Sequence, residues 1–158
     1  MPWSKVKEYL DQNGVPYVTI SHSPAYTAQG VAAAAHVKGK ELAKVVIIKV
    51  DGKLAMAVLP APYKVNTDKL REAIGCRELK LAAEEEFGHL FPDCELGAMP
   101  PFGNLYGMEV YVAGSLTENE EIAFNAGSHS ELIRLAYRDF ERLVKPKVLR
   151  FSTHGSAA

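Results

Sequence analysis

Residues 45–59 form the sequence VVIIKVDGKLAMAVL, and this stretch decides the fold class. The Asp51-Gly52 pair separates two apolar runs, and this dipeptide tolerates the positive φ angles that a two-residue hairpin turn requires. The run 45–48 is continuously apolar rather than alternating, which is typical of a strand covered on both faces. We therefore expect a β-hairpin, with strands at 45–50 and 53–59, in the middle of a sheet.

The flanking segments predict a mixture of helices and strands around this hairpin. Apolar spacing and end signals predict helices at 3–10, 28–36, 67–74, 83–87 and 137–144. Further strands are expected at 15–20, 78–81, 109–113, 121–125, 132–135 and 148–151, with 109–113 and 121–125 alternating like a neighbouring pair. The predicted fold class is α/β (α+β), with a mixed, mostly antiparallel central sheet and helices packed around it.

Composition limits the classes of protein that the chain can represent. Its 158 residues, 47% of them hydrophobic, suit one domain at 1–151, and the Ser/Gly/Ala-rich residues 152–158 are expected to be a disordered tail. A formal charge of -1 excludes a broad basic surface for nucleic acid, although a local basic patch stays possible. Cys76 and Cys94 have no zinc-ligand or redox spacing. Since no apolar run reaches the roughly 18 residues of a membrane span, we expect a cytoplasmic protein with no membrane partner.

The segment 94–103, CELGAMPPFG, predicts a stiff loop. Each proline fixes φ and lacks an N–H, and it forces the preceding residue into an extended conformation. Gly97 and Gly103 would let the backbone approach a ligand closely. The alternative is an ordinary surface turn, which the same residue types also favour.

Two further positions are candidates for chemistry. Lys44 stands at the start of the apolar strand, where its ammonium could hold a phosphate or a developing oxyanion, or simply extend into water. The sequence Asn125-Ala126-Gly127-Ser128-His129-Ser130 could form a backbone nest for an anion or an ester, or a loop whose serines satisfy their own backbone.

Several kinds of site are excluded by spacing. A serine nucleophile beside His129 is disfavoured, because adjacent residues of a strand point to opposite faces and no G-x-S-x-G turn is present. The other histidines lack metal-ligand spacing such as H-E-x-x-H, so no metal is expected. Glycine-rich phosphate loops are absent, and we expect no cofactor.

Four segments together resemble one family in type and order. They are Tyr26-Thr27-Ala28, Leu42-Ala43-Lys44-Val45-Val46, Gly97 to Gly103 and Asn125 to His129. The chain resembles the YbaK/ProX-type aminoacyl-tRNA deacylases, free-standing relatives of the editing domain of prolyl-tRNA synthetase, from about Val15 to Val148. The resemblance implies an enzyme that hydrolyses the ester of a mischarged tRNA in trans, without a metal or a covalent nucleophile. The substrate would carry a small amino acid such as alanine or cysteine on tRNA(Pro).

The resemblance also implies roles for individual residues. Lys44, Gly97 and Pro101 would be the catalytic residues. The substrate would be bound by Tyr26, Thr27, Ala98, Met99, Pro100, Phe102, Asn125, Gly127, Ser128 and His129. The expected partner is the 3′-terminal aminoacyl-adenosine of tRNA, with a synthetase or elongation factor as a further partner. The alternative is an inactive module of the same fold that grips an aminoacyl-tRNA end or a synthetase.

Overall fold

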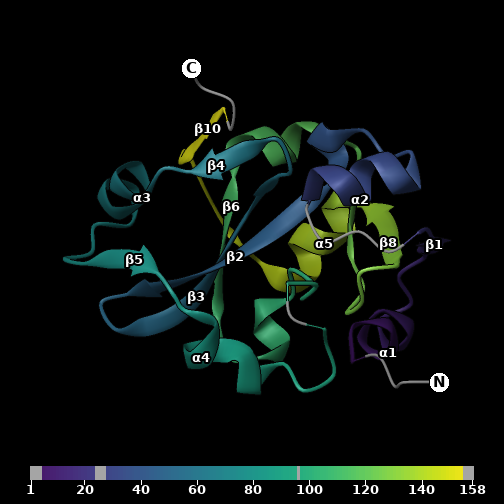
Figure 1. Ribbon diagram of the computed structural model, residues 1–158, viewed down its shortest axis with the longest axis horizontal. Coiled ribbons are helices and arrows are strands. Elements are labelled where there is room, and N and C mark those ends of the chain that lie inside the picture. The colour runs from purple at the N-terminus through teal and green to yellow at the C-terminus, as the bar shows by residue number, and fades with distance from the viewer. Residues whose placement is uncertain (1–4, 24–27, 96, 155–158) are drawn as a thin grey trace.

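The computed structural model describes residues 5–23, 28–95 and 97–154, which form an α+β fold (Figure 1). The α-helices are α1 (Lys5–Gln12), α2 (Ala28–Ala35), α3 (Thr67–Ile74), α4 (Glu84–Phe87) and α5 (Tyr137–Val144). The strands are β1 (Val18–Ser21), β2 (Ala43–Val50), β3 (Lys53–Pro60), β4 (Tyr63–Val65), β5 (Leu79–Leu81), β6 (Glu109–Ala113), β7 (Glu121–Asn125), β8 (Glu131–Ala136), β9 (Lys147–Leu149) and β10 (Ser152–His154). In Figure 1, β2 crosses the middle, with α3 and β5 to one side and α2, β8 and β1 to the other.

The predicted hairpin is confirmed and is central to the largest sheet. Its order is β5-β2-β3-β6-β9, while β1-β8-β7 and β10-β4 form two smaller sheets. Strands β2 and β3 pair antiparallel along their whole length, from Ala43 opposite Pro60 to Val50 opposite Lys53. Asp51 and Gly52 have φ angles of 49° and 85°, as this type of tight turn requires.

The prediction that 109–113 and 121–125 form a neighbouring pair is wrong. Strand β6 lies parallel to both β3 and β9, whereas β7 pairs with β8 in another sheet. The 3₁₀ segment Gly114–Glu118 between them turns the chain from one sheet to the other. The sequence pattern therefore located both strands correctly, but it carries no information about which strand lies beside which.

The end of the chain also departs from expectation. The strand predicted at 148–151 is β9 and covers Lys147–Leu149. Phe151 lies beyond its end, because the Phe151 side chain is buried in the core and its carbonyl accepts a hydrogen bond from the Asn66 N–H at 2.7 Å. Ser152–His154 then pairs with β4 as β10, so the expectation of a disordered tail starting at 152 is wrong for these three residues. Residues 155–158 lie outside the described part.

The large sheet separates two hydrophobic clusters, and a third lies beneath α2. Along β2, Ala43 and Ile47 pack with the cluster that contains Phe102, Phe124 and Phe140. Ile48, the residue after Ile47, packs on the other face with a cluster that includes Leu59, Leu70 and Phe151. The third cluster joins Val31, Leu42, Ala61, Ala123 and Leu132. Among residues 5–23, 28–95 and 97–154, no helix is long and apolar enough to cross a membrane.

Candidate functional site

Hydrogen bonds join the proline-rich loop to the segment 125–130, although the two are about thirty positions apart in the sequence. The Glu95 N–H donates to the Gly127 carbonyl at 2.7 Å, and the Gly127 N–H donates to the Ala98 carbonyl at 3.0 Å. The Glu95 side chain adds a third link, because its Oε1 accepts from the His129 N–H at 2.7 Å. Two segments that the sequence singled out separately therefore form one unit, which we call the paired loops (residues 95, 97–103 and 125–130).

Both glycines at the contact are required by geometry. Gly97 has φ +85° and Gly127 has φ +98°, conformations that side chains other than glycine rarely adopt. A Cβ at Gly97 would also lie 3.4 Å from Cε1 of His129. The imidazole ring of His129 therefore lies close to Gly97.

Lys44 lies in strand β2 of the large sheet, opposite Leu59 of β3. Its Nζ donates to the Ala61 carbonyl at 3.1 Å, just beyond the end of β3, and the residue is partly buried. Burial lowers the pKa of the Lys44 ammonium from its ordinary value of 10.5, and the positive charge of Lys64 lowers it further. The lysine is therefore held in place at some electrostatic cost, unlike a lysine that extends freely into water.

Strand pairing relates Lys44 to Asn125 through the residues two positions before each of them. Leu42 and Ala123 form an isolated parallel bridge between the start of β2 and β7, and these strands contact each other. Two residues further along each strand, Lys44 and Asn125 emerge on the same face as that bridge, because strand side chains alternate. The pairing thus links the lysine to the end of β7, where the 125–130 loop begins.

Two buried polar atoms on this side of the fold are unsatisfied. Asn125 Oδ1 and His22 Nε2 have no hydrogen-bond partner in the part of the chain that the structure describes. His22 follows β1, and its N–H donates to the Ser130 carbonyl at 2.9 Å. Its Nδ1 lies 2.8 Å from the Ser23 carbonyl, which can only accept, so Nε2 of the neutral ring is an acceptor. The sequence analysis did not assign His22 or Glu95 to the site. For His22, the only indication in the sequence was its position in a predicted turn directly after a strand.

The other predicted site residues have different environments. Gly97 is exposed, whereas Ala98, Met99, Pro100 and Pro101 are buried. Ser128 Oγ accepts from the Ser130 N–H at 3.3 Å, so the loop does satisfy part of its own backbone. Tyr26 and Thr27 lie outside the described residues.

Phe102 requires a correction. Its side chain has no exposed surface and packs against Tyr9, Phe124 and Phe140, with ring centroids 6.2, 5.5 and 5.5 Å away. It belongs to the cluster that packs with Ala43 and Ile47, on the opposite face of β2 from Lys44. Phe102 therefore anchors the paired loops from below and does not line a substrate site.

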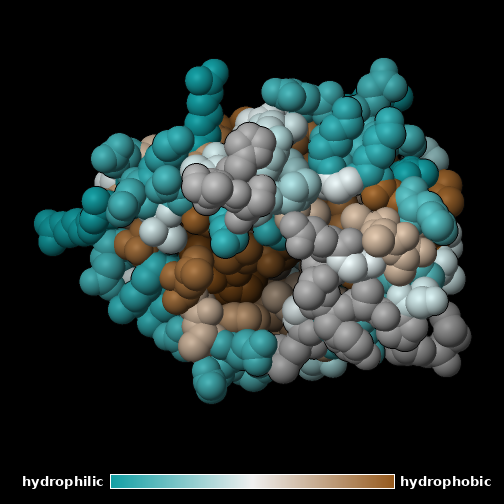
Figure 2. All heavy atoms as spheres, turned by 45° about the horizontal axis from the view of Figure 1, so that its top comes forward, coloured by the Kyte–Doolittle hydropathy of each residue, from teal (hydrophilic) through white to brown (hydrophobic). Residues whose placement is uncertain are grey.

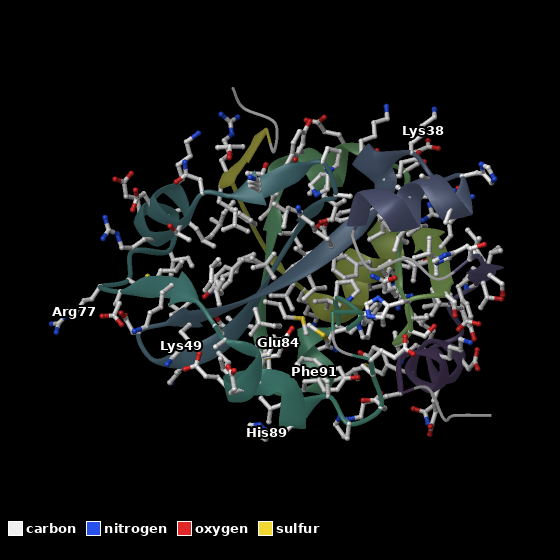
Figure 3. All side chains as sticks on the ribbon, viewed as in Figure 1. Lys38, Lys49, Arg77, Glu84, His89 and Phe91 are labelled. Carbon is white, nitrogen blue, oxygen red and sulfur yellow. The ribbon has the colours of Figure 1, made fainter. Side chains whose placement is uncertain are left out.

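Other reactive groups offer little chemistry. Cys76 and Cys94 are free thiols, and burial raises the pKa of Cys94 to about 11, so this thiol stays protonated and weakly nucleophilic. The described residues contain no group of three or more His, Cys, Asp or Glu placed to hold a metal ion. In Figure 3, Lys38 and Arg77 lie at opposite outer edges and Lys49 lies towards α4, so positive charge is spread over the molecule.

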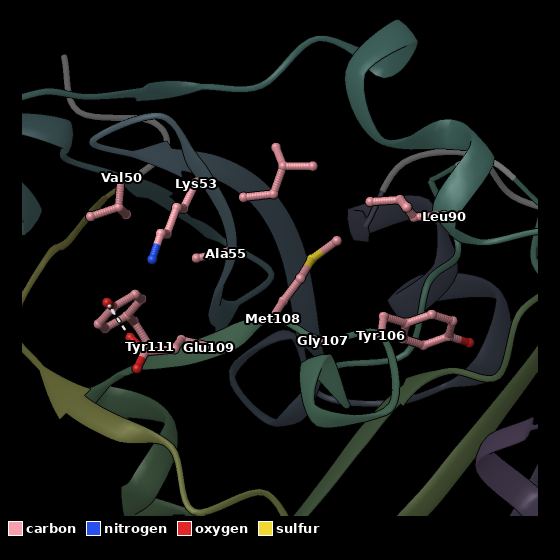
Figure 4. A pocket seen from close by; sticks show the side chains of 10 residues that line it. Val50, Lys53, Ala55, Leu90, Tyr106, Gly107, Met108, Glu109 and Tyr111 are labelled. Carbon is pink, nitrogen blue, oxygen red and sulfur yellow. Dashed lines mark hydrogen bonds between the residues drawn. The ribbon is translucent and has the colours of Figure 1, made fainter.

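A cavity elsewhere in the described part of the chain contains none of the predicted site residues. One cavity of about 550 Å³ lies beside the hairpin tip (Figure 4). It is lined by Val50, Lys53, Leu54, Ala55, Leu90, Tyr106, Gly107, Met108, Glu109 and Tyr111. Burial and the 2.8 Å hydrogen bond to Glu109 raise the pKa of Tyr111 to about 12, so its hydroxyl stays neutral. On the face drawn in Figure 2, hydrophobic atoms gather in a hollow near the middle, with polar side chains farther to its left.

Residues 22–143 match the family model of the aminoacyl-tRNA editing domain. The chain belongs to this family. The match spans Lys44, the paired loops and both unsatisfied acceptors, and it confirms the family assigned from the sequence motifs.

Individual relatives agree with the family. The chain is 28% identical over 150 residues to the Multifunctional Ser/Thr-tRNA deacylase ProXp-y of Escherichia coli K12, covering 90% of this chain and 87% of the relative. A proline–tRNA ligase of Bacillus mycoides is 29% identical over 80 residues, which is 51% of this chain and 14% of the ligase. Among solved structures, the hypothetical protein APE2540 superposes with a TM-score of 0.83 at 21% identity, covering 94% of this chain and 99% of that one. A protein provisionally described as a trans-editing enzyme for prolyl tRNA synthetase gives 0.78 at 20%, covering 94% of each chain. The structures confirm the predicted fold class.

Proposed function

We propose that this protein is an aminoacyl-tRNA deacylase that hydrolyses the ester between an amino acid and the 3′-terminal adenosine of a mischarged tRNA. Family membership over residues 22–143 carries the proposal. The geometry supports it, because the loop containing Gly97 is bonded to the segment that follows β7, and Leu42, two residues before Lys44, bridges to Ala123 of β7. Lys44, Gly97 and Pro101 are the proposed catalytic residues.

Hydrolysis of this ester requires few catalytic groups. Water adds to the ester carbonyl carbon, a tetrahedral oxyanion forms, and the C–O bond then breaks, so that the ribose 3′-oxygen leaves with a proton. The Lys44 ammonium supplies a positive charge near the site, which suits either the oxyanion or a phosphate of the tRNA end. The N–H groups of Glu95, Ala98, Gly127 and His129 are already used inside the paired loops. Exposed Gly97 is therefore the position at which the backbone approaches the ester most closely.

The amino acid is proposed to be small. The His129 ring lies close to Gly97 and limits the space beside the exposed backbone of the loop, and exclusion by size suits an editing enzyme. Alanine and cysteine on tRNA(Pro) remain candidates, and serine and threonine join them because of the name of the Escherichia coli relative. We further propose that the protein acts in the cytoplasm and that a synthetase or an elongation factor contributes to tRNA selection, since a net charge of -1 provides little general attraction.

A panel of mischarged tRNAs tests this function directly. The purified protein is expected to release serine, threonine, alanine or cysteine from tRNA faster than the spontaneous reaction. Lys44→Ala should slow this release at least about tenfold, equivalent to roughly 1.4 kcal/mol in the barrier. Since the ammonium of Lys44 is partly desolvated, the variant should melt no lower than the wild type.

Two results would contradict the proposal in different ways. Equal activity of the wild type and Lys44→Ala would remove the lysine from the mechanism. If no ester in the panel is cleaved, the protein is instead a binding module of the same fold, and it should then retain affinity for a non-hydrolysable aminoacyl-adenosine. Lys38→Ala is a matched control, because Lys38 lies at the outer surface (Figure 3).

A further inference from the structure

The side-chain oxygen of Asn125 is buried and unsatisfied at the end of β7. Asn125 Oδ1 has no partner in the described part of the chain, whereas most buried side-chain acceptors in proteins have one. Leaving such an acceptor unpaired destabilises the free protein. A ligand group that donates a hydrogen bond to this oxygen would remove that destabilisation. We therefore expect a ligand with a hydrogen-bond donor at this position.

The surroundings of Asn125 are mainly apolar on this face. In the β1-β8-β7 sheet, Ile20, Leu132 and Asn125 lie in one row across the three strands, with their side chains on the same face. Leu132 packs with Val31 and Leu42 in the cluster beneath α2. The oxygen is therefore an acceptor in a mainly apolar setting, which is the arrangement by which small-molecule sites fix orientation.

The positive charge of Lys44 limits which ligand groups can donate a hydrogen bond to Asn125 Oδ1. Because Lys44 and Asn125 emerge on the same face from the Leu42–Ala123 bridge, a positively charged donor at Asn125 would be repelled by the ammonium. This disfavours the α-amino group of the substrate as the partner of Oδ1. A neutral hydroxyl meets no such repulsion.

We propose that Asn125 is a specificity-determining residue whose Oδ1 accepts a hydrogen bond from the side-chain hydroxyl of the amino acid on the tRNA. This rests on the deacylase function proposed above. A site that pairs a buried acceptor with a substrate hydroxyl discriminates strongly against the analogue that lacks it, because the acceptor is then left unpaired. Seryl and threonyl esters would accordingly be preferred to alanyl esters of similar size.

The vicinal hydroxyl of the terminal ribose is the competing donor. It is present in every aminoacyl-tRNA, whereas a side-chain hydroxyl is present in only some. Loss of a contact to the ribose would slow all esters equally, and loss of a contact to the side chain would change their ratio. The ratio of rates for seryl and alanyl esters on one tRNA therefore distinguishes the two.

The test compares the wild type with Asn125→Ala on Ser-tRNA and Ala-tRNA, measuring kcat/KM for each. The wild type is expected to prefer the seryl ester. Asn125→Ala should lower kcat/KM for the seryl ester at least about tenfold, the scale of one hydrogen bond to a desolvated group. For the alanyl ester it should change kcat/KM less than about threefold. Asn13→Ala, on an exposed asparagine at the end of α1, is the matched control and should change neither.

Stability gives a readout independent of catalysis. Because the oxygen is unsatisfied in the free protein, Asn125→Ala should not lower the melting temperature. Equal losses on both esters, an unchanged ratio, or a melting temperature several degrees lower would each overturn the proposal.

Failure of the deacylase function itself would be visible separately. If the wild type cleaves no ester, the same comparison is made by calorimetry with amide-linked seryl- and alanyl-adenosine, which cannot be hydrolysed. Preference for the seryl compound that is lost in Asn125→Ala would support the assignment of Asn125. Equal affinities in the wild type would refute it.

Discussion

The two sides of the candidate site are held by different kinds of interaction. On the sheet side, Lys44 belongs to a long strand whose pairing with β3 is continuous and whose turn is formed by adjacent residues. On the loop side, Gly97 and His129 are in no regular element, and they are held by bonds between segments about thirty positions apart. The sheet side is thus specified locally, and the loop side only by the completed fold.

This difference predicts where substitutions act. Changes on the sheet side away from Lys44 should alter stability without altering the reaction, because the hairpin forms whether or not the paired loops do. Changes that break the link between Glu95 and His129 should alter the reaction more than stability, because that hydrogen bond is exposed. The exception is the aromatic anchor beneath the loop.

The largest expected effect comes from that anchor. Phe102→Ala removes a fully buried ring that packs against three others, and it should lower the free energy of unfolding by about 3–5 kcal/mol. Urea unfolding followed by circular dichroism measures the change. Leu81→Ala, on a side chain that is 58% exposed in β5, is the control and should change stability by no more than about 0.5 kcal/mol. Similar values for the two variants would show that the loop is not anchored in the core.

An intermediate effect is expected at Glu95, which links the paired loops through the His129 N–H. Glu95→Ala should lower kcat for the preferred ester roughly fivefold, equivalent to about 1 kcal/mol for one exposed hydrogen bond. Glu95→Gln keeps an oxygen that can accept from the same N–H and should restore most of the rate. Amide exchange of His129, followed by NMR, should quicken in the alanine variant only.

Two outcomes at Glu95 would be decisive. Glu95→Gln could be as slow as Glu95→Ala while its His129 amide stays protected from exchange. The reaction would then depend on the negative charge of the Glu95 carboxylate rather than on its hydrogen bond to the His129 N–H. If neither variant changed kcat, the loops would not need this contact. Glu85→Ala, on an exposed glutamate of α4, is the matched control for loss of one negative charge.

Sequence reasoning succeeded where the determining residues are neighbours in the chain. The Asp51-Gly52 turn, the helix Tyr137–Val144 and the helix that ends at Gly75 were predicted with correct or nearly correct ends. The occurrence of Lys44 together with the Gly97 loop, in the expected order, indicated the aminoacyl-tRNA editing family. These features follow from local backbone preferences and from short motifs.

Sequence reasoning failed where the determining residues are distant. Nothing in residues 109–125 indicates that β6 lies parallel to β3 and β9 while β7 joins β8. Phe102 was assigned to substrate because it adjoins a site motif, but a motif does not specify which way a side chain turns. The unsatisfied oxygen of Asn125 depends on every neighbour in the fold, so no pattern in the sequence could reveal it.

The smallest expected effect tests the sheet side through a second glutamate, Glu86. Its carboxylate accepts from Lys49 Nζ at 2.6 Å and from the Ala83 N–H at 2.8 Å, and these bonds hold the pKa of Glu86 below its ordinary 4.5. A lowered pKa in the folded state contributes stability above the unfolded value, and this is lost as pH falls through the folded value. Between pH 7 and pH 3, Glu86→Gln should therefore lose less melting temperature than the wild type, while its deacylation rate at pH 7 stays unchanged. Glu85→Gln, on an exposed glutamate of the same helix, is the matched control for the loss of one negative charge. A slower reaction in Glu86→Gln would mean that α4 influences the site and that the two sides are not independent.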